Sequence, residues 1–460
     1  MNRRPNLLLL MTDQQRADAL GCVSDWVNTP HLDRLAQEGV RFRNCVTTSP
    51  VCIPARLSLA TGLYPHNTWV WDNGHHTLDP RSPTWMQAVR AAGYRTSLFG
   101  KTHLHPHGGD LRDREHLMHE YGLDDVDEIG GPRASARVLS HMTAGWEHLG
   151  LWRAYREDLD DRFATKPHVA RPSPLPLAHY ADTYVGEGAN AYLRDYDGDQ
   201  PWCCWVSFGG PHEPWDTPDE FARRYDPDQM PASIPLPEWA SHPGDRPLGA
   251  LDKRLAQRPA LDPQDVAAMR ANYAGNVELI DDQIGQILAT LESRGDLDNT
   301  LIIFTSDHGE MNGDFGLIYK SQLLNSAVRV PLIVRPPKGA IESQGAINDS
   351  PAEWMDVGAT LCEMGGTRAV GFSQSLLPGT ADVTHHHRTG AISEMNGEVM
   401  WLDVDHKAVL NTDGEVYLLF DRHSDPDEQD NLAGTSRAAD DENRLRLRIL
   451  ERLMQTQVRA

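Results

Sequence analysis

The sequence is poor in cysteine and in positive charge. Its six cysteines, at positions 22, 45, 52, 203, 204 and 362, are few for 460 residues and include no Cys-x-x-Cys pair. This argues against a disulfide framework or a cysteine-ligated zinc site. The 43 basic and 66 acidic residues give a formal net charge of -23, which opposes binding to nucleic acid or to anionic lipid surfaces. An anionic ligand therefore requires a local group of basic side chains.

Long apolar runs are also missing. No segment reaches the ~18 consecutive apolar residues of a membrane span. The first residues begin like a signal peptide, but the apolar run at 7–11 is too short for one and is followed by Asp13. We therefore expect a cytoplasmic protein with no membrane segment.

Short apolar runs are present, and they are continuous rather than alternating. They cover residues 6–12, 96–100, 202–208, 300–306 and 330–334. Such runs are typical of strands buried on both faces of a mostly parallel sheet. Helical patterns separate them, one beginning at Thr29-Pro30 and ending before Gly39, another running from Asp262-Pro263 to Gly295. The sequence predicts an α/β fold, with a large, mostly parallel sheet sandwiched by helices.

The pattern changes twice along the chain. Prolines are dense from about 209 to 262, which indicates a long surface excursion. After residue 375, short strand-like pieces appear, two of them joined by Asp413-Gly414, a hairpin signal. Residues 441–457 have the pattern of an amphipathic helix. We predict a large α/β domain over 1–375 and a C-terminal subdomain over 376–460, with a small antiparallel sheet and a helix.

Polar residues gather where four of the predicted strands end. In chain order they are Asp13 and Gln14, Lys101 and His103, His212, and Asp307 and His308. The carboxyl ends of parallel strands meet at one edge of a sheet, so we expect these groups to converge. Carboxylates, an amide and an imidazole suit a divalent cation. The alternative is that the acidic residues only cap the helices that follow.

Cys52 lies between two prolines in the stretch TTSPVCIPARLSLATG, residues 47–62. Residues 54–61 are plausible as a helix, which places the thiol at a helix amino terminus, a position that lowers a thiol pKa. A cysteine nucleophile also needs a base, and Arg56 is not one. A reactive thiolate alone therefore does not explain the stretch.

Cys-Ile-Pro-Ala-Arg matches the Cys-x-Pro-x-Arg signature of the sulfatase family, within the alkaline phosphatase superfamily. The resemblance continues in family order through TDQQR, TPHLDRLAQEGVRF, TGLYPH, GKTHL, GGPHEPW, TSDHGEMNGDFG, RVPLIVR and DPDEQDNLA. It covers most of the chain.

The resemblance implies that Cys52 is oxidised to formylglycine by a maturation enzyme and that its hydrated aldehyde is the nucleophile. It also implies a metal site of Asp13, Gln14, Cys52, Asp307 and His308, and hydrolysis of a sulfate ester of a small molecule or saccharide. The remaining implied roles are Asp307 as base, Arg56 as the group that holds the diol, Lys101 and Lys320 as sulfuryl ligands, His212 as acid to the leaving alcohol, and His103 as base in the second step.

Some positions depart from the common family pattern. Gln14 stands where many members have a second aspartate, Asp314-Phe315 replaces a more usual Asp-His, and Leu324-Asn325 replaces tyrosine and glutamate. A neutral amide and an imidazole reduce the charge of the site, so calcium is the first expectation, with manganese or magnesium as alternatives.

Other aromatic and histidine residues are weaker candidates. The candidates for the substrate pocket are Trp69, Trp71, Asn73, His75, His76, His105 and His107. The run of histidines at 103, 105 and 107 is awkwardly spaced for a tetrahedral zinc site. The triplet at 385–387 is expected in a loop.

Three functions are compared. The first is a sulfatase. The second is a phosphonate monoester or phosphodiester hydrolase of the same superfamily, whose members tend to have hydroxyl residues where this chain has Lys101 and His103. The third, a silent anion-binding protein, predicts the loss of a ligand or of the signature, and none is lost. The sequence leaves sugar, aryl and small alkyl sulfates open.

Overall fold

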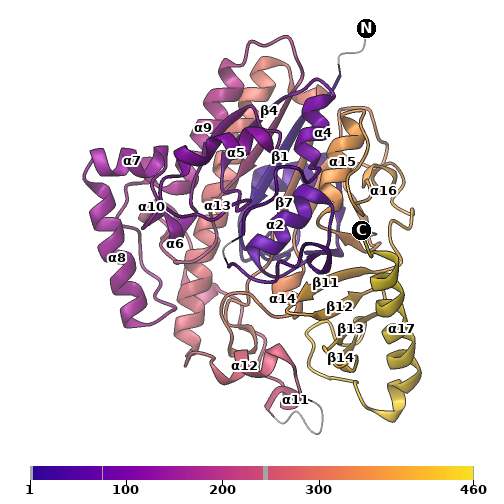
Figure 1. The fold of residues 1–460 in the computed structure, drawn as a ribbon. Coiled ribbons are helices and arrows are strands. Elements are labelled where there is room, and N and C mark those ends of the chain that lie inside the picture. Colours follow the sequence, from indigo (N-terminus) through magenta and orange to yellow (C-terminus); the bar gives the residue numbers. More distant parts are fainter. Residues whose placement is uncertain (1–3, 75, 242–246, 459–460) are drawn as a thin grey trace.

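The computed structural model describes residues 4–74, 76–241 and 247–458. Within these residues, eight strands form one large sheet. In spatial order they are β5 (Asp125–Glu128), β4 (Arg95–Gly100), β6 (Trp202–Ser207), β1 (Asn6–Thr12), β7 (Thr300–Ser306), β8 (Leu332–Arg335), β2 (Val40–Phe42) and β9 (Ala346–Asn348). Only β8 runs antiparallel to its neighbours. The predicted large, mostly parallel sheet is confirmed (Figure 1).

Helices cover both faces of this sheet. One layer contains α2 (Cys52–Thr61), α4 (Trp85–Ala91) and α15 (Asp356–Met364), and the other α1 (Pro30–Glu38), α9 (Ala181–Asp195) and α13 (Pro263–Arg294). Along β1, Leu7, Leu9 and Met11 enter the first core, whereas Leu8 and Leu10 enter the second. Because strand side chains alternate between faces, a strand covered on both sides requires a continuous apolar run.

The predicted helices form close to their expected limits. The side chain of Asp262 caps α13 by accepting from the Asp265 amide at 2.7 Å, and the helix ends at Gly295, whose φ is 71°. Left-handed backbone of this kind favours glycine. Helix α2 begins at Cys52, two residues before the predicted start, and all of its residues are buried. Cys52 therefore opens a helix inside the protein.

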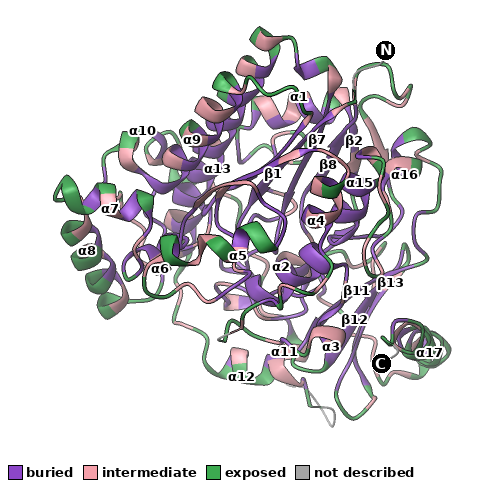
Figure 2. Cartoon of the chain, turned by 45° about the horizontal axis from the view of Figure 1, so that its top comes forward, coloured by how far each residue is buried: buried purple, intermediate pink, exposed green. Residues whose placement is uncertain are grey.

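The C-terminal sheet is separate and antiparallel. It contains β11 (Ala391–Met395), β12 (Glu398–Leu402), β13 (His406–Leu410) and β14 (Val416–Asp421), and Asp413-Gly414 lies in the β13–β14 hairpin. One face packs against α17 (Ala439–Gln455) through Leu445 and Ile449. Figure 2 shows α17 with its outer side exposed. The small sheet with its helix is confirmed, and the division at residue 375 stays a prediction.

The proline-dense excursion contains short helices, among them α10 (Asp219–Ala222), α11 (Glu238–Ser241) and α12 (Ala250–Ala256). Helix α12 returns to the body of the molecule, where Leu251 and Leu255 pack in the same core as Leu324. Over the described part of the chain, no helix combines the length and the apolar composition needed to cross a membrane.

Candidate active site

The ends of β1 and β7 are joined by one buried arginine. Arg56 on α2 donates from Nε to Asp307 Oδ2 at 2.8 Å and from Nη2 to Asp13 Oδ2 at 3.0 Å. All three side chains are fully buried. Charges removed from water in this way are stable only when each is paired and hydrogen-bonded. Arg56 therefore fixes the positions of both carboxylates.

The end of β4 is tied to the same group. The Lys101 carbonyl accepts from Arg56 Nη1 at 2.6 Å, and the Lys101 ammonium donates to Asp13 Oδ2 at 2.5 Å. Arg56 Nη1 also donates to Ser207 Oγ, at the end of β6, at 3.1 Å. The predicted convergence of the strand ends is present in the structure.

The thiol of Cys52 lies inside this group and is 1% exposed. Its Sγ is 3.1 Å from His308 Nε2 and 3.8 Å from Asn73 Nδ2. Burial alone would raise the pKa of the thiol, but the charges of Lys101 and Lys320 lower that pKa well below its ordinary value. The surroundings of Cys52 therefore stabilise negative charge at this position.

A metal ion fits this arrangement. Asp13, Cys52, Asp307 and His308 each offer a ligand atom, and these atoms lie within 4.8 Å of one another. Asp13 Oδ1 is buried and has no hydrogen-bond partner within the described chain. An unpartnered carboxylate oxygen is costly unless a cation or donor reaches it. The donor set of carboxylate oxygens and an imidazole suits a divalent cation.

Gln14, the fifth predicted ligand, is held at the edge of this group. Its amide oxygen accepts from Lys320 Nζ at 2.5 Å, and its Nε2 donates to Glu213 at 2.9 Å and to Glu310. Burial and the charge of Glu213 raise the pKa of Glu310 to about 7. Sequence reasoning missed both glutamates; Glu213 directly follows His212 in GGPHEPW, but nothing in the pattern marks it as a partner of Gln14.

His212 and Lys320 form a pair on the far side of the thiol. Lys320 Nζ is 2.5 Å from His212 Nε2, and His212 Nδ1 contacts the Glu213 carbonyl at 2.7 Å. Burial would lower the pKa of Lys320, but the negative charges at Cys52 and Glu213 raise it above its ordinary value. The ammonium therefore stays charged beside the imidazole.

His103 faces the thiol from β4. Burial, together with the charge of Lys101, lowers its pKa well below the ordinary value, and its Nδ1 is buried with no partner among the residues described. Its ring contacts the ring of His107 at a centroid distance of 4.3 Å, with the two planes tilted by 43°. His103 is thus a neutral imidazole, the form that can accept a proton.

The neighbouring histidines bind a carboxylate behind His103. His105 Nε2 and His107 Nε2 lie 2.7 and 3.2 Å from the two oxygens of buried Glu128. Neither His105 nor His107 lines the cavity over Cys52. The prediction that they line the substrate pocket is wrong, because Glu128, which no sequence signal marked, draws both rings into the interior.

The backbone at two site residues is left-handed, with φ 71° at Gln14 and 56° at His103. This conformation costs free energy in residues other than glycine and is held only where the surrounding contacts determine it. Here the backbone N–H of Gln14 donates to Asp307 Oδ1 at 3.0 Å. The strain lies at the two strand ends that approach Cys52.

A cavity of about 320 Å³ opens over the thiol. The sequence-predicted residues on its wall are Cys52, Asn73, Lys101, His103, His212 and Lys320. The cavity is also lined by Arg133, Arg137, Arg254 and Tyr319. Sequence reasoning missed these four residues because they come from distant segments of the chain. Asp13, Asp307 and Arg56 lie beneath it, fully buried.

Several weaker candidates lie elsewhere. Trp69 is 79% exposed, and neither Trp71 nor His76 lines the cavity. His75 falls outside the described residues. The triplet at 385–387 lies outside helices and strands, as expected, and His387 contacts Asp356 at 2.8 Å.

Apart from Gln14, the positions that depart from the family pattern make structural contacts. Asp314 is buried and accepts from Arg16 and Arg270, both at 2.7 Å. Leu324 is buried in a core cluster, and the Asn325 amide donates to Glu428 at 2.9 Å. None of these three side chains lines the cavity over Cys52.

The chain is similar to known proteins over most of its length. The chain is 32% identical over 477 residues to the multifunctional alkaline phosphatase superfamily protein PehA of Trinickia caryophylli, covering 94% of this chain and 91% of that protein. It is 27% identical over 379 residues to the arylsulfatase of Clostridium perfringens, covering 78% and 74%. Phosphonate monoester hydrolase of Agrobacterium radiobacter superposes with a TM-score of 0.77 at 26% identity, covering 98% of this chain and 95% of that one.

The fold and these relatives define an enzyme of the alkaline phosphatase superfamily. The family model described as Sulfatase matches residues 5–367. The chain belongs to the sulfatase family and is a hydrolase.

Proposed function

We propose that this enzyme hydrolyses a sulfate monoester to an alcohol and inorganic sulfate, with Cys52 converted to formylglycine and with one divalent cation, calcium first. The observation that carries the proposal is the position of Cys52. Its side chain lies in one group with Asp13, Asp307 and His308, beneath a cavity whose wall includes Lys101 and Lys320.

The residues present support each step of the reaction. One hydroxyl of the hydrated Cys52 aldehyde loses its proton to Asp307 and attacks sulfur, and the bond to the leaving oxygen breaks. A carboxylate oxygen of Asp307 lies within 4.8 Å of the Cys52 side chain. Arg56 neutralises the charge that develops on the diol. A bound divalent cation supplies Lewis-acid stabilisation of negative charge on oxygen.

The leaving alcohol takes a proton from the pair of His212 and Lys320. Their nitrogens are 2.5 Å apart, within hydrogen-bonding distance, so a proton can pass between them. Lys101 and Lys320 are assigned to the sulfuryl oxygens, where their positive charges stabilise negative charge in the transition state. His103 then takes the proton of the second Cys52 hydroxyl. The carbonyl re-forms, the carbon–oxygen bond to sulfate breaks, and water restores the hydrate.

Maturation has to precede folding around Cys52. At 1% exposure the thiol is out of reach of another enzyme, so a formylglycine-generating partner would act on the unfolded segment. Peptide mass spectrometry of active enzyme is expected to show residue 52 as the aldehyde or its hydrate. Cys52→Ala is expected to stay folded and lose turnover, and Cys52→Ser to do the same, because an alcohol cannot collapse back to a carbonyl. Full activity with an unmodified thiol would contradict the mechanism.

A second candidate is hydrolysis of phosphonate monoesters or phosphodiesters. It is favoured by the likeness to a phosphonate monoester hydrolase over 98% of this chain. Those substrates retain a second substituent on phosphorus, which needs room. Lys101 and His103 both line the 320 Å³ cavity beside Cys52 and would crowd that substituent.

Matched aryl esters separate the two candidates. We expect kcat/KM for an aryl sulfate to exceed that for the matching phenyl phosphonate by at least about tenfold, or roughly 1.4 kcal/mol of transition-state discrimination. Lys101→Ala is expected to lower kcat more than it raises KM. A clear preference for the phosphonate or the diester would assign the enzyme to the second candidate.

A further inference from the structure

The wall of the cavity over Cys52 is strongly basic in an otherwise acidic protein. Its ionisable lysine, arginine and carboxylate residues are Lys101, Arg133, Arg137, Arg254, Lys320 and Glu213. Five cations thus share one lining with a single carboxylate, although the whole chain has a formal charge of -23. A concentration of one sign at a cavity indicates a ligand of the opposite sign.

Three of these cations are already engaged. Lys101 pairs with Asp13 at 2.5 Å, and Lys320 contacts Gln14 and His212. Arg133 pairs with Glu213 at 3.1 Å. Lys101 contacts Asp13 and Lys320 contacts Gln14, two of the predicted metal ligands, so both lysines lie at the reacting centre. The remaining arginines are therefore not needed to bind a single sulfate ester group.

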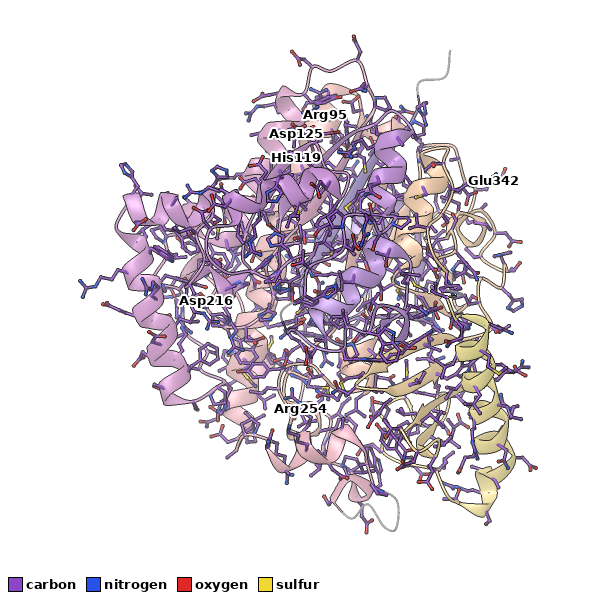
Figure 3. The ribbon with its side chains drawn as sticks, in the orientation of Figure 1. Arg95, His119, Asp125, Asp216, Arg254 and Glu342 are labelled. Atoms are coloured by element: carbon purple, nitrogen blue, oxygen red, sulfur yellow. The ribbon has the colours of Figure 1, made fainter. Side chains whose placement is uncertain are left out.

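Arg137 and Arg254 are the cations left over. Neither guanidinium forms an ion pair with a carboxylate in the described part of the chain, which runs over 4–74, 76–241 and 247–458. Arg254, on α12 and labelled in Figure 3, is partly buried. Its Nη2 donates to the Lys320 carbonyl at 2.6 Å, which holds it against the cavity wall. Burial lowers its pKa, as expected for a cation that is desolvated without a carboxylate partner.

We propose that Arg137 and Arg254 bind a second anionic group on the substrate, so that the preferred ester is one whose alcohol itself has a carboxylate or a second sulfate. The inference rests on the sulfate-ester reaction proposed above. Guanidinium groups bind either anion through paired N–H donors. The cavity volume of 320 Å³ lies at the small end of the range for ligand sites, so the second anion belongs on the same ring as the reacting ester or directly beside it.

Kinetics on paired substrates test this. The pairs are an aryl sulfate with and without a ring carboxylate, and a hexosamine 6-sulfate with and without an N-sulfate. The wild-type enzyme is expected to favour the dianion in at least one pair by about tenfold or more in kcat/KM, and the double variant Arg137→Gln/Arg254→Gln to reduce that preference to about threefold or less. Which pair responds shows whether carboxylate or sulfate is bound.

Lys253→Gln is the matched control. Lys253 lies on the same helix as Arg254, is exposed, and does not line the cavity. The Lys253→Gln substitution removes one positive charge beside Arg254 without changing the cavity wall, so this variant is expected to keep the preference for the dianion. If the two arginines only attract anions at long range, the double variant will lose rate equally on both members of each pair, and that result overturns the proposal. So does a wild-type enzyme that shows no preference for either dianion.

A binding measurement separates this inference from the proposed reaction. Calorimetry compares the binding of 3-sulfobenzoate and benzenesulfonate. Both are sulfonates that resist hydrolysis, and benzenesulfonate has one negative charge fewer. Tighter binding of the dianion by wild type, lost in Arg137→Gln/Arg254→Gln at unchanged Tm, supports the anion site even if no sulfate ester is turned over. Equal affinities for 3-sulfobenzoate and benzenesulfonate, with sulfate esters hydrolysed and no dianion preferred, refute the site and leave the reaction standing.

Discussion

Replacing Arg56 with methionine removes the buried cation that holds two carboxylates in place. Asp13 keeps its pair with Lys101 at 2.5 Å, whereas Asp307 loses the only ion pair that it forms with an arginine or lysine among the described residues. An unpaired buried carboxylate can avoid the free-energy cost of a desolvated charge by taking up a proton. At pH 7 this costs about 4 kcal/mol for a carboxyl of ordinary pKa, a value within the range measured for broken buried ion pairs.

The corresponding change in Tm is small because the chain is long. With ~2.1 cal/mol/K per residue, the 460 residues have an unfolding entropy of about 1 kcal/mol/K if they unfold together. We therefore expect Arg56→Met to lower Tm by about 4 °C at pH 7. Scanning calorimetry of the two proteins measures it. Arg153→Met is the control, because Arg153 is 86% exposed and its pair with Glu157 is expected to contribute little.

A divalent cation is expected to restore part of this loss. In the variant, Asp13 and Asp307 remain beside Cys52 and His308. An ion that binds there displaces the proton from Asp307 and neutralises the carboxylates as Arg56 does in the wild type, so binding stabilises the folded state by linkage. Millimolar calcium is therefore expected to raise Tm more for Arg56→Met than for the wild type. An unchanged Tm in the variant would refute the assignment of Arg56, and an equal calcium effect on both proteins would refute its electrostatic coupling to the metal group.

Two further changes test other parts of the site. Chelation of the ion in wild-type enzyme is expected to lower both turnover and Tm, and Asp307→Ala to abolish ion binding measured by calorimetry; no effect of chelation on either property would contradict the metal site. Burial would raise the pKa of Glu128, but hydrogen bonds from His105 and His107 depress it, so its stabilising contribution is present above the unfolded-state pKa and is lost as the pH falls. Burial would lower the pKa of His105, but hydrogen bonding to Glu128 outweighs burial and raises that pKa, so the pair contributes most where both groups are charged. Glu128→Gln is expected to cost about 2 kcal/mol near pH 5 and less near pH 3, and a deficit in Tm that grows from pH 5 to pH 3 would refute this.

The sheet could be predicted from local sequence because its central strands are buried on both faces. A strand in that position has few polar residues, and β1, β6 and β7 each show such a run. The edge strands give no such signal. β5 has the acidic sequence DVDE, and β9 has only three residues, as does its interior neighbour β2. Edge strands are half solvated, so their residues resemble those of loops.

The same reasoning explains what was found in the site. Asp13, Lys101 and Asp307 follow buried strands directly, so topology alone brings them to one edge of the sheet. Arg137 and Arg254 reach the cavity only through the path of segments outside the sheet, and no local pattern specifies that path. His105 was misplaced because its direction is set by Glu128, a partner more than twenty residues away.

The charges of the inner site explain how a strongly acidic protein can bind an anionic ester. Three carboxylates and three cations meet there, namely Asp13, Glu213 and Asp307 with Arg56, Lys101 and Lys320. Their charges cancel, so this group alone has no net attraction for an anion. A divalent cation adds two positive charges in a buried site, where the effective dielectric is low and the interaction with an anion is strong. On the function proposed here, the ion would therefore govern affinity for the ester as well as its reaction, whereas the arginines at the cavity wall would add attraction only for a substrate with a second anion.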